Sequence, residues 1–359
     1  MTSDVDVLVL GGGPAGAATA LALAHGGASV AVAGRSRGDR PRIGETVPPT
    51  IIAPLAQLGV WDAFVADGHA PAPGTVVRWG TEQSYENDFI LNPYGHGWHL
   101  DRARYDAMMI SAADRAGAHI HDLPPGGRVE HDGGGWTLRI PNRPSLRAPF
   151  VVDATGRVAR IAARQGATRH REDRLIGLVR FGQAATTEDR TLLEACAEGW
   201  WYAAVLPDAR AVTAFFTDAD LLPVGAVERD RFWVQALSRT RGVPEIMATT
   251  GASQIHTATA HTSMLSECTG ADWLAVGDAA RTLDPLSGQG LITALTSAIR
   301  AAKAVLGARR TAALDGFSQQ TAEEHRTHLS TGLAHYRRED RWPRSPFWQR
   351  RHRRLQATH

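Results

Sequence analysis

Apolar residues follow two different periods along this chain, one typical of helices that alternate with buried strands and one typical of antiparallel sheets. An apolar run at residues 5–10 (VDVLVL) ends in glycines and is followed by an Ala-rich segment from Ala15 to His25. A second apolar run, residues 29–33 (SVAVA), comes next. A strand, a helix and a strand in this order predict a βαβ unit at the start of the chain.

Further along, apolar positions at helical spacing predict three more helices, at about residues 50–64, 101–117 and 288–306. A hairpin around three glycines and two buried strands are predicted at residues 128–140, 150–156 and 272–276. Residues 75–92 and 170–262 instead contain strand-like runs such as LIGLVRFG, GWWYAAVL and AVTAFFTD, and the tail beyond residue 311 is predicted to be helical. We therefore expect an α/β fold: a Rossmann-like nucleotide-binding domain interleaved with an antiparallel β-sheet, and a helical C-terminus.

The composition indicates an ordinary soluble protein. The chain has 359 residues and a formal net charge of +2, so no electrostatic argument points to nucleic acid. The first apolar run begins after Asp4 and Asp6 and is interrupted by glycines, so it lacks the basic start of a signal peptide and the continuity of a membrane helix. We expect a cytoplasmic protein that binds neither nucleic acid nor membranes.

Few residues have the spacing of a metal site. Cys196 and Cys268 are too few and too far apart for a disulfide scaffold or a zinc site, so we expect buried thiols. His96 and His99 have i, i+3 spacing without cysteines or paired carboxylates nearby. We therefore predict no metal ion.

A glycine motif connects the first strand to the first helix. Gly11, Gly13 and Gly16 form GxGxxG, with Pro14 and Ala15 inside the motif. Such glycines allow a tight turn and let a pyrophosphate approach the N-terminus of the helix. The motif predicts dinucleotide binding.

The second strand lacks the acid that usually follows this motif. Gly34 stands 23 residues after Gly11, where an Asp or Glu ordinarily binds the ribose hydroxyls. Its absence removes one charge-assisted hydrogen bond, worth roughly 1.5 to 3 kcal/mol. We expect the dinucleotide to be lost readily, and a glutamate at position 34 to tighten its retention.

Three motifs in order, GGGPAG, DATGR and GDAARTLDPLSGQG, resemble those of single-component flavin monooxygenases of the aromatic-hydroxylase type and of their halogenase and geranylgeranyl-reductase relatives. The resemblance covers most of the chain and implies that the dinucleotide is FAD. It implies that Asp278, after Gly277, binds the ribityl chain. It also implies that Pro285 and the segment from Gly288 to Leu291, which includes Gln289 and Gly290, lie against the flavin ring.

Three arginines and an acid are further candidates for the FAD site, and Arg35 is one of them because it follows Gly34 and could compensate for the missing acid. Arg102 matches an arginine that approaches the FAD pyrophosphate, Arg42 is a second candidate for the phosphates, and Arg35 is a candidate to cover the adenine. IGETVPP resembles the GESLPP-like signature of this group, which implies that Glu45 lies near the flavin at the edge of the substrate pocket. Glu45 and Pro285 are therefore our catalytic candidates.

Other segments look most like flavoproteins that oxygenate protein-bound tryptophan during quinone cofactor maturation. These segments are NPYGHGWHLDR, GWWYAAVLP and the closing RWPRSPFWQRR. Trp200, Trp201 and Tyr202 lie on one predicted strand and are candidates for the wall of an aromatic pocket, although alternate side chains of a strand point to opposite faces. Ordinary core packing is the alternative for each of them.

We therefore expect residues 1–74, 98–168 and 264–310 to form the FAD-binding domain, residues 75–97 and 169–263 the substrate domain, and residues 311–359 the C-terminal helical segment. The predicted function is hydroxylation of an electron-rich aromatic, of indole or tryptophan type and free or peptide-bound, through a flavin hydroperoxide. Because no second Gly-rich βαβ unit occurs, the reductant would be transiently bound NAD(P)H or reduced flavin from a partner reductase.

Three alternatives remain open at this point. The chain could be a flavin-dependent halogenase, a flavin reductase or dehydrogenase of the geranylgeranyl-reductase type, or a flavin-binding module without activity. The first is disfavoured because the chain has one lysine, Lys303, and reads Tyr-Ala-Ala-Val-Leu before Pro207 where halogenases carry W-x-W-x-I-P.

Overall fold

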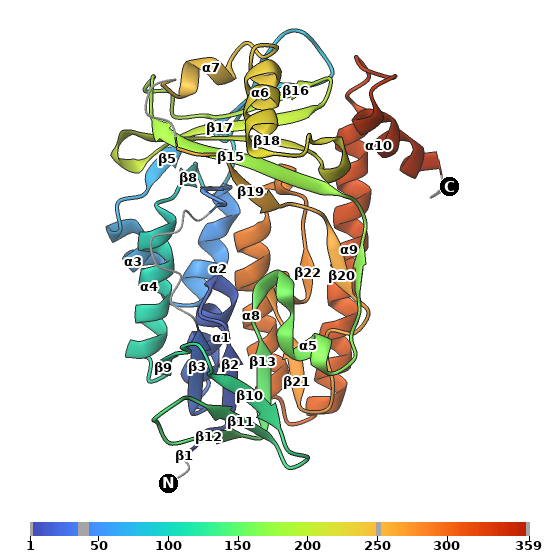
Figure 1. The fold of residues 1–359 in the computed structure, drawn as a ribbon. Coiled ribbons are helices and arrows are strands. Elements are labelled where there is room, and N and C mark those ends of the chain that lie inside the picture. Colours follow the sequence, from blue (N-terminus) through green and yellow to red (C-terminus); the bar gives the residue numbers. More distant parts are fainter. Residues whose placement is uncertain (1–2, 35–42, 249–252, 357–359) are drawn as a thin grey trace.

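The computed structural model describes residues 3–34, 43–248 and 253–356. A five-stranded parallel sheet occupies the lower half of the molecule (Figure 1), in the order β21-β13-β2-β3-β9. Its strands are β2 (Val7–Leu10), β3 (Val30–Gly34), β9 (His119–Asp122), β13 (Phe150–Asp153) and β21 (Trp273–Ala275). This is the predicted Rossmann-like sheet. Its strands β2 and β3, together with the helix between them, form the predicted βαβ unit.

Alternate residues of this sheet enter two separate cores. Val7, Val9 and Val152 pack under the helices α1 (Pro14–His25), α4 (Arg102–Arg115) and α8 (Gly290–Leu306). Leu8 and Val151 point the other way. They meet α5 (Arg160–Arg164) and the hairpin β10 (Arg128–His131) and β11 (Trp136–Arg139), which joins β12 (Leu146–Ala148) and β1 (Ser3–Asp4) in a four-stranded sheet. The predicted hairpin is thus confirmed.

A seven-stranded sheet lies above, in the order β19-β15-β18-β17-β16-β6-β7. All its neighbours are antiparallel except β16 and β6, which are parallel. The strands are β6 (Gly74–Arg78), β7 (Tyr85–Asp88), β15 (Leu175–Gln183), β16 (Thr191–Cys196), β17 (Gly199–Leu206), β18 (Arg210–Asp218) and β19 (His256–Thr259). Helices α6 (Ala226–Leu237) and α7 (Val243–Ile246) cover its outer face.

Two small sheets connect the large ones. One contains β4 (Thr46–Val47), β8 (Gly97–His99) and β5 (Ala70–Ala72); the other contains β14 (Arg169–Arg171), β20 (Ser263–Leu265) and β22 (Arg281–Thr282). The five parallel strands fall in the segments assigned above to the FAD-binding domain, and the seven-stranded sheet falls in the other segments except for Gly74. The domain boundaries themselves stay a prediction.

The single helix expected at residues 50–64 is wrong. The chain forms instead a 3-10 turn (Pro49–Ile51), α2 (Ile52–Gln57) and α3 (Trp61–Ala66). Gly59 separates the two helices with a φ of +69°, in the left-handed region that ends helices. The apolar period continues across this break, so periodicity alone did not reveal it.

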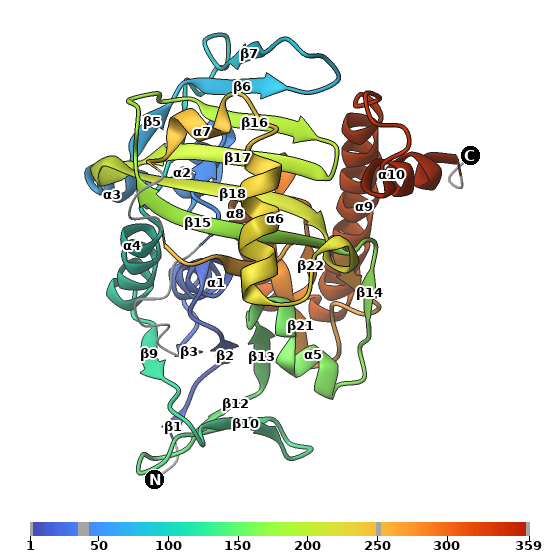
Figure 2. The same ribbon diagram turned by 45° about the horizontal axis from the view of Figure 1, so that its top comes forward.

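The helical C-terminus is confirmed. Helix α9 (Arg310–Arg337) is a long helix along one side of the molecule, and α10 (Pro346–Gln356) lies across its upper end (Figure 2). Indole N–H groups fasten these helices: Trp79 donates to the carbonyl of His335 at 3.0 Å, and Trp348 donates to that of Cys196 at 2.8 Å. Much of the tryptophan content of the chain therefore serves this junction between helices and sheet.

Candidate active site

The turn between β2 and α1 is built by close approach of backbone atoms. Gly11 has a φ of +119°, and a Cβ there would lie 2.2 Å from the carbonyl oxygen of Ala154 at the end of β13. A Cβ on Gly16 would lie 1.8 Å from the carbonyl oxygen of Gly11. Only glycine fits at these two positions. At Gly13, by contrast, no described atom lies within 4 Å of an added Cβ, so the turn opens there.

Two helix N-termini are left without side-chain caps. Helix α1 begins after Gly13 and α8 begins after Gln289, and neither capping residue gives a side-chain hydrogen bond to the first turn in the described structure. Gly290, like Gly13, has no described atom within 4 Å of an added Cβ. The exposed N–H groups of such helix ends need acceptors, and phosphate and carbonyl oxygens suit them. The two ends fit the pyrophosphate and the ring of FAD.

The segment before α8 changes from buried to accessible at Pro285. Residues 279–284 are buried, whereas Pro285 and Gly290 are exposed and residues 286–289 are partly exposed. The accessible segment begins with a 3-10 turn (Pro285–Ser287). The chain then changes direction at Gly288, which has a φ of +63°. We refer to residues 285–290 as the flavin loop, because the family resemblance assigns the flavin ring to it.

Gly277 fixes the start of this region against α1 and α8. Its N–H donates to the Oγ of Ser297 at 3.0 Å, and a Cβ on Gly277 would lie 2.7 Å from the Cβ of Ala15. Sequence reasoning missed Ser297, which lies 20 residues further along the chain. The neighbouring Asp278 side chain is 48% exposed and lies 3.6 Å from the Nε of Arg157. Its carboxylate is therefore accessible to a ligand hydroxyl.

Gly34 lacks the carboxylate that usually binds the ribose, and it also lies in close contact with the glycine turn. A Cβ at this position would lie 2.8 Å from the backbone nitrogen of Gly12. The end of β3 therefore sits closer to the glycine turn than any other residue would allow. A glutamate at position 34 would have to displace the turn, so the structure opposes the gain in retention that the sequence suggested.

The arginine candidates differ in their placement. Arg102 donates to the carbonyls of Ile43 and Gly44 at 2.5 and 3.1 Å, and its guanidinium lies 3.3 Å from Asp106. In this arrangement it ties the segment before Glu45 to α4. Arg35 and Arg42 lie outside the described residues.

Glu45 is a buried carboxyl with one oxygen that is unpaired among the described residues. It is 3% exposed, and its Oε2 accepts from the N–H of Gly44 at 3.0 Å. Its Oε1 has no hydrogen-bond partner among the described residues. Burial raises the pKa of this carboxyl to about 7, although the nearby charges of Arg102 and Arg210 act in the opposite direction. Such a group exchanges a proton near neutral pH.

Tyr202 belongs to the same place, on the inner face of the seven-stranded sheet. Its hydroxyl lies 2.6 Å from the Oγ1 of Thr46, next to Glu45. Thr46 in turn lies 3.5 Å from Thr191, whose hydroxyl is 3.0 Å from the Nε2 of His99. Sequence reasoning missed this hydrogen-bonded chain because its members come from β4, β8, β16 and β17, of which only the last two are consecutive along the sequence.

The other two aromatic candidates are occupied by packing. Trp200 stacks on Phe216 with ring centroids 4.2 Å apart and donates its indole N–H to the hydroxyl of Tyr336 at 3.0 Å. Trp201 lies on the opposite face of the sheet, against Trp233 of α6. Of the three, Tyr202 alone is hydrogen-bonded beside Glu45 in the described structure.

Pro48 links the Glu45 segment to the flavin loop. A Cβ on Gly288 would lie 3.8 Å from the Cδ of Pro48, and Leu286 packs against the apolar cluster to which Tyr202 belongs. Glu45, Tyr202 and the flavin loop therefore converge from three separate parts of the sequence.

Cys196 and Cys268 are buried free thiols, as expected. Within residues 3–34, 43–248 and 253–356, no cluster of three metal-ligating side chains occurs, and no helix is both long and apolar enough to cross a bilayer.

Comparison with known proteins identifies the family of the chain. A family model described as "FAD binding domain" matches residues 4–329. The putative FAD-dependent oxidoreductase LodB of Marinomonas mediterranea is 29% identical over 357 residues, which cover 97% of this chain and 96% of that protein.

Two solved structures extend the comparison. The peptidyl tryptophan dihydroxylase QhpG, described as essential for tryptophylquinone cofactor biogenesis, is 29% identical with a TM-score of 0.77, covering 98% of this chain and 79% of that one. The myxobacterial chondrochloren halogenase CndH has a TM-score of 0.85 at 22% identity, covering 99% of this chain and 89% of that one, and therefore shares the fold. The family resemblance carried by the three motifs is confirmed, and with it the prediction of an FAD-dependent enzyme. The chain belongs to the FAD binding domain family.

Proposed function

We propose that this protein is a flavin-dependent monooxygenase that hydroxylates an electron-rich aromatic ring of indole or tryptophan type, free or within a peptide. The observation that carries the proposal is the environment of the Glu45 carboxyl. Its buried Oε1 has no partner in the described chain, the adjacent Thr46 lies 2.6 Å from the Tyr202 hydroxyl, and burial and the charge of Glu45 raise the pKa of Tyr202. The same segment contains Pro48, which lies close to the flavin loop. A substrate ring placed there would find one group that exchanges a proton and one fixed hydroxyl.

These residues divide the work as follows. Bound FAD would supply the redox chemistry and the activation of oxygen. A ring carbon that has received an oxygen atom must lose its proton to become aromatic again. Glu45, with a pKa raised to about 7 by burial, is suited to accept that proton at Oε1 at neutral pH. Tyr202, held by Thr46, would orient the substrate by a hydrogen bond.

The position of the lysine favours oxygenation over halogenation. Lys303 is exposed in the last turn of α8, 13 residues after Gly290. At 1.5 Å per residue the two positions are about 20 Å apart along the helix axis. A lysine that directs a halogenating species would have to lie beside the substrate, and Lys303 lies at the far end of the helix that starts at the flavin loop.

An indole substrate is supported by the similarity to the peptidyl tryptophan dihydroxylase, which extends over 98% of this chain.

As the source of electrons for the flavin, we propose either transient binding of NAD(P)H or delivery of reduced flavin by a partner reductase. The only GxGxxG turn between a parallel strand and a helix in the described chain is that at Gly11, and its geometry fits FAD.

The test is product analysis with purified protein, reduced FAD, air and bromide, offered tryptophan, indole and a tryptophan-containing peptide. We expect a hydroxylated product from at least one substrate and none from free reduced flavin. A brominated product would favour the halogenase. An oxidised product that contains no new oxygen atom would favour the dehydrogenase. FAD binding without any substrate-dependent oxidation would leave only the binding module.

A further inference from the structure

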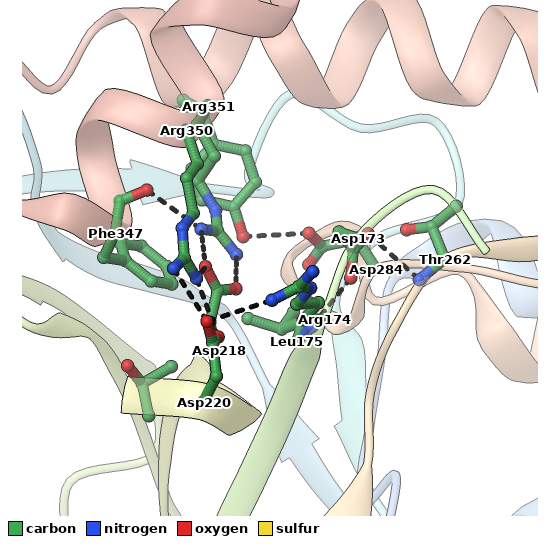
Figure 3. Close-up of polar contacts among 12 residues, drawn as sticks. Asp173, Arg174, Leu175, Asp218, Asp220, Thr262, Asp284, Phe347, Arg350 and Arg351 are labelled. Carbon is green, nitrogen blue, oxygen red and sulfur yellow. Dashed lines mark hydrogen bonds and ion pairs between the residues drawn. The ribbon is translucent and has the colours of Figure 1, made fainter. Parts of the chain in front are cut away.

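A small cavity lined by both polar and apolar residues lies on the side of the flavin loop that faces the C-terminal helices. Its volume is about 30 Å³, room for about two water molecules. Charged and polar side chains from separate elements line it, among them Asp173, Asp284, His328, Tyr336 and Arg351. Figure 3 shows Asp284 and Asp173 close together, with Arg351 approaching from α10. None of these residues contributes to the chemistry proposed above.

Asp284 holds the first turn of the flavin loop. It directly precedes Pro285 and is 8% exposed. Its Oδ1 accepts from the N–H of Leu286 at 3.0 Å, and its backbone carbonyl accepts from the Oγ of Ser287 at 3.0 Å. The direction in which the loop leaves the buried segment therefore depends on the orientation of this carboxyl.

Helix α9 fixes that orientation. The hydroxyl of Tyr336 donates to the Oδ2 of Asp284 at 2.8 Å and accepts from the indole N–H of Trp200 at 3.0 Å. The Nε2 of His328 accepts from the backbone N–H of Asp284 at 3.3 Å. Both oxygens of the Asp284 carboxyl are thus engaged, one by the loop and one by the C-terminal segment.

Helix α10 completes the network. The guanidinium of Arg351 is buried over the ring of Phe347, with 3.4 Å to the centroid, and lies 5.0 Å from the centroid of the Tyr336 ring. It donates to the Oδ1 of Asp218 at 3.0 Å (Figure 3). A buried charge needs such a partner, so Arg351 locks α10 to the sheet and keeps Tyr336 in place.

We propose that the C-terminal helices are part of the cofactor site: Asp284 is a positioning residue that sets the flavin loop, and Tyr336 and Arg351 position Asp284. The inference rests on the proposed placement of the flavin ring at residues 285–290. It assigns to the C-terminal segment a function in FAD binding, in addition to its packing on the sheet.

The network also makes the loop sensitive to pH. The charged and titratable groups that face Asp284 are Asp173, His328 and Tyr336, together with Arg351. Burial, with a contribution from Asp173, raises the pKa of Asp284 to about 6, and burial lowers the pKa of His328 to about 4. Above about pH 6 the ionised carboxylate accepts from both Leu286 and Tyr336. Because burial raises this pKa above the ordinary 3.8, the loop is held most firmly where Asp284 is protonated, and it is held less firmly as the pH rises from 3.8 to about 6.

The test compares Tyr336→Phe with Tyr105→Phe. Tyr105 is equally buried, but its hydroxyl has no hydrogen-bond partner in the described part of the chain. Hydrogen exchange of the backbone amides of residues 286–290 in the full FAD-free chain, expressed as protection relative to the unstructured chain, reports the loop directly. Titration with FAD gives the dissociation constant of each variant.

For Tyr336→Phe we expect about tenfold lower protection of the loop and about tenfold weaker FAD binding, because one hydrogen bond to a buried carboxylate is lost. Tyr105→Phe should match the wild type. Asp284→Asn should abolish the change in protection between pH 5 and pH 7. Equal protection and equal FAD affinity in Tyr336→Phe and Tyr105→Phe would overturn the inference, even if Tyr336→Phe were less stable. Neither readout needs turnover, so a wild type that binds FAD without hydroxylating would refute the proposed function alone.

Discussion

Replacing Glu45 by Gln should make the FAD-free protein more stable at alkaline pH, although the substitution is in the candidate site. Burial raises the pKa of Glu45 from an ordinary value of 4.5 to about 7. Below pH 4.5 the folded and the unfolded chain both carry the proton, and the burial has no electrostatic cost. Between pH 4.5 and 7 the unfolded chain releases the proton first, so the folded state loses stability as the pH rises. Above pH 7 the loss is complete.

The magnitude follows from the pKa difference. At 1.36 kcal/mol for each pH unit, the ionised Glu45 lowers the free energy of unfolding by about 3 kcal/mol. Glutamine has the same shape, keeps an acceptor for the N–H of Gly44 and carries no charge, so the variant avoids this loss. Between pH 5 and pH 8 we expect the free energy of unfolding of the wild type to fall by about 2.5 kcal/mol more than that of the variant, because part of the loss has already occurred at pH 5.

The assay is urea denaturation of both proteins at pH 5, 6, 7 and 8, followed by tryptophan fluorescence. Comparing the two proteins cancels other groups that titrate in this range, such as Asp284. The matched control is Glu194→Gln, because Glu194 is also buried but both its oxygens accept backbone N–H groups, from Arg241 and Gly242. That variant should be less stable than the wild type at pH 8. Parallel pH curves for the wild type and Glu45→Gln would refute the reasoning.

Three further predictions concern the cofactor and the reaction. Asp278→Ala should largely abolish FAD binding without unfolding the chain, because an accessible carboxylate beside Gly277 is lost, whereas a full flavin spectrum in the variant would remove Asp278 from the site. Gly34→Glu should weaken rather than tighten FAD retention in an equilibrium titration, because its Cβ would lie 2.8 Å from the nitrogen of Gly12, and tighter binding would show that the turn adapts. Lys303→Ala should leave turnover unchanged, since this exposed residue is in the last turn of α8, and a loss of most activity would contradict the proposed separation of lysine and substrate.

Much of the fold was predictable because its signals are local. Gly11 and Gly16 belong to one short motif, although the backbone contact that requires Gly11 comes from the distant Ala154. Four of the five parallel strands are short apolar runs, and β9 is the exception. The break at Gly59 was missed because the apolar period continues through it while a single positive φ ends the helix. Gly34 shows the limit in another way: the sequence reveals the missing acid, but only the structure reveals the close approach of Gly12.

The candidate site was predictable only where one motif carries it. Glu45 and the flavin loop lie within motifs of the family. The chain from Tyr202 through Thr46 and Thr191 to His99, and the contact of Asp284 with Tyr336 across 52 residues, join distant segments whose pairing no local pattern specifies. The packing of Trp200 was also hidden from the sequence. Its aromatic ring made it a candidate for the wall of a substrate pocket, but it packs against α9 and donates its indole N–H to Tyr336.

The most direct test of the proposed reaction is the origin of the oxygen atom in the product. Purified protein, reduced FAD and the preferred indole or peptide substrate would be incubated under oxygen enriched in the heavy isotope in ordinary water, and in parallel under ordinary oxygen in heavy-isotope water. If the protein is a monooxygenase, mass spectrometry will find one heavy oxygen per hydroxylation in the first experiment and none in the second. Label from water, or a product that contains no new oxygen, would contradict the proposed function.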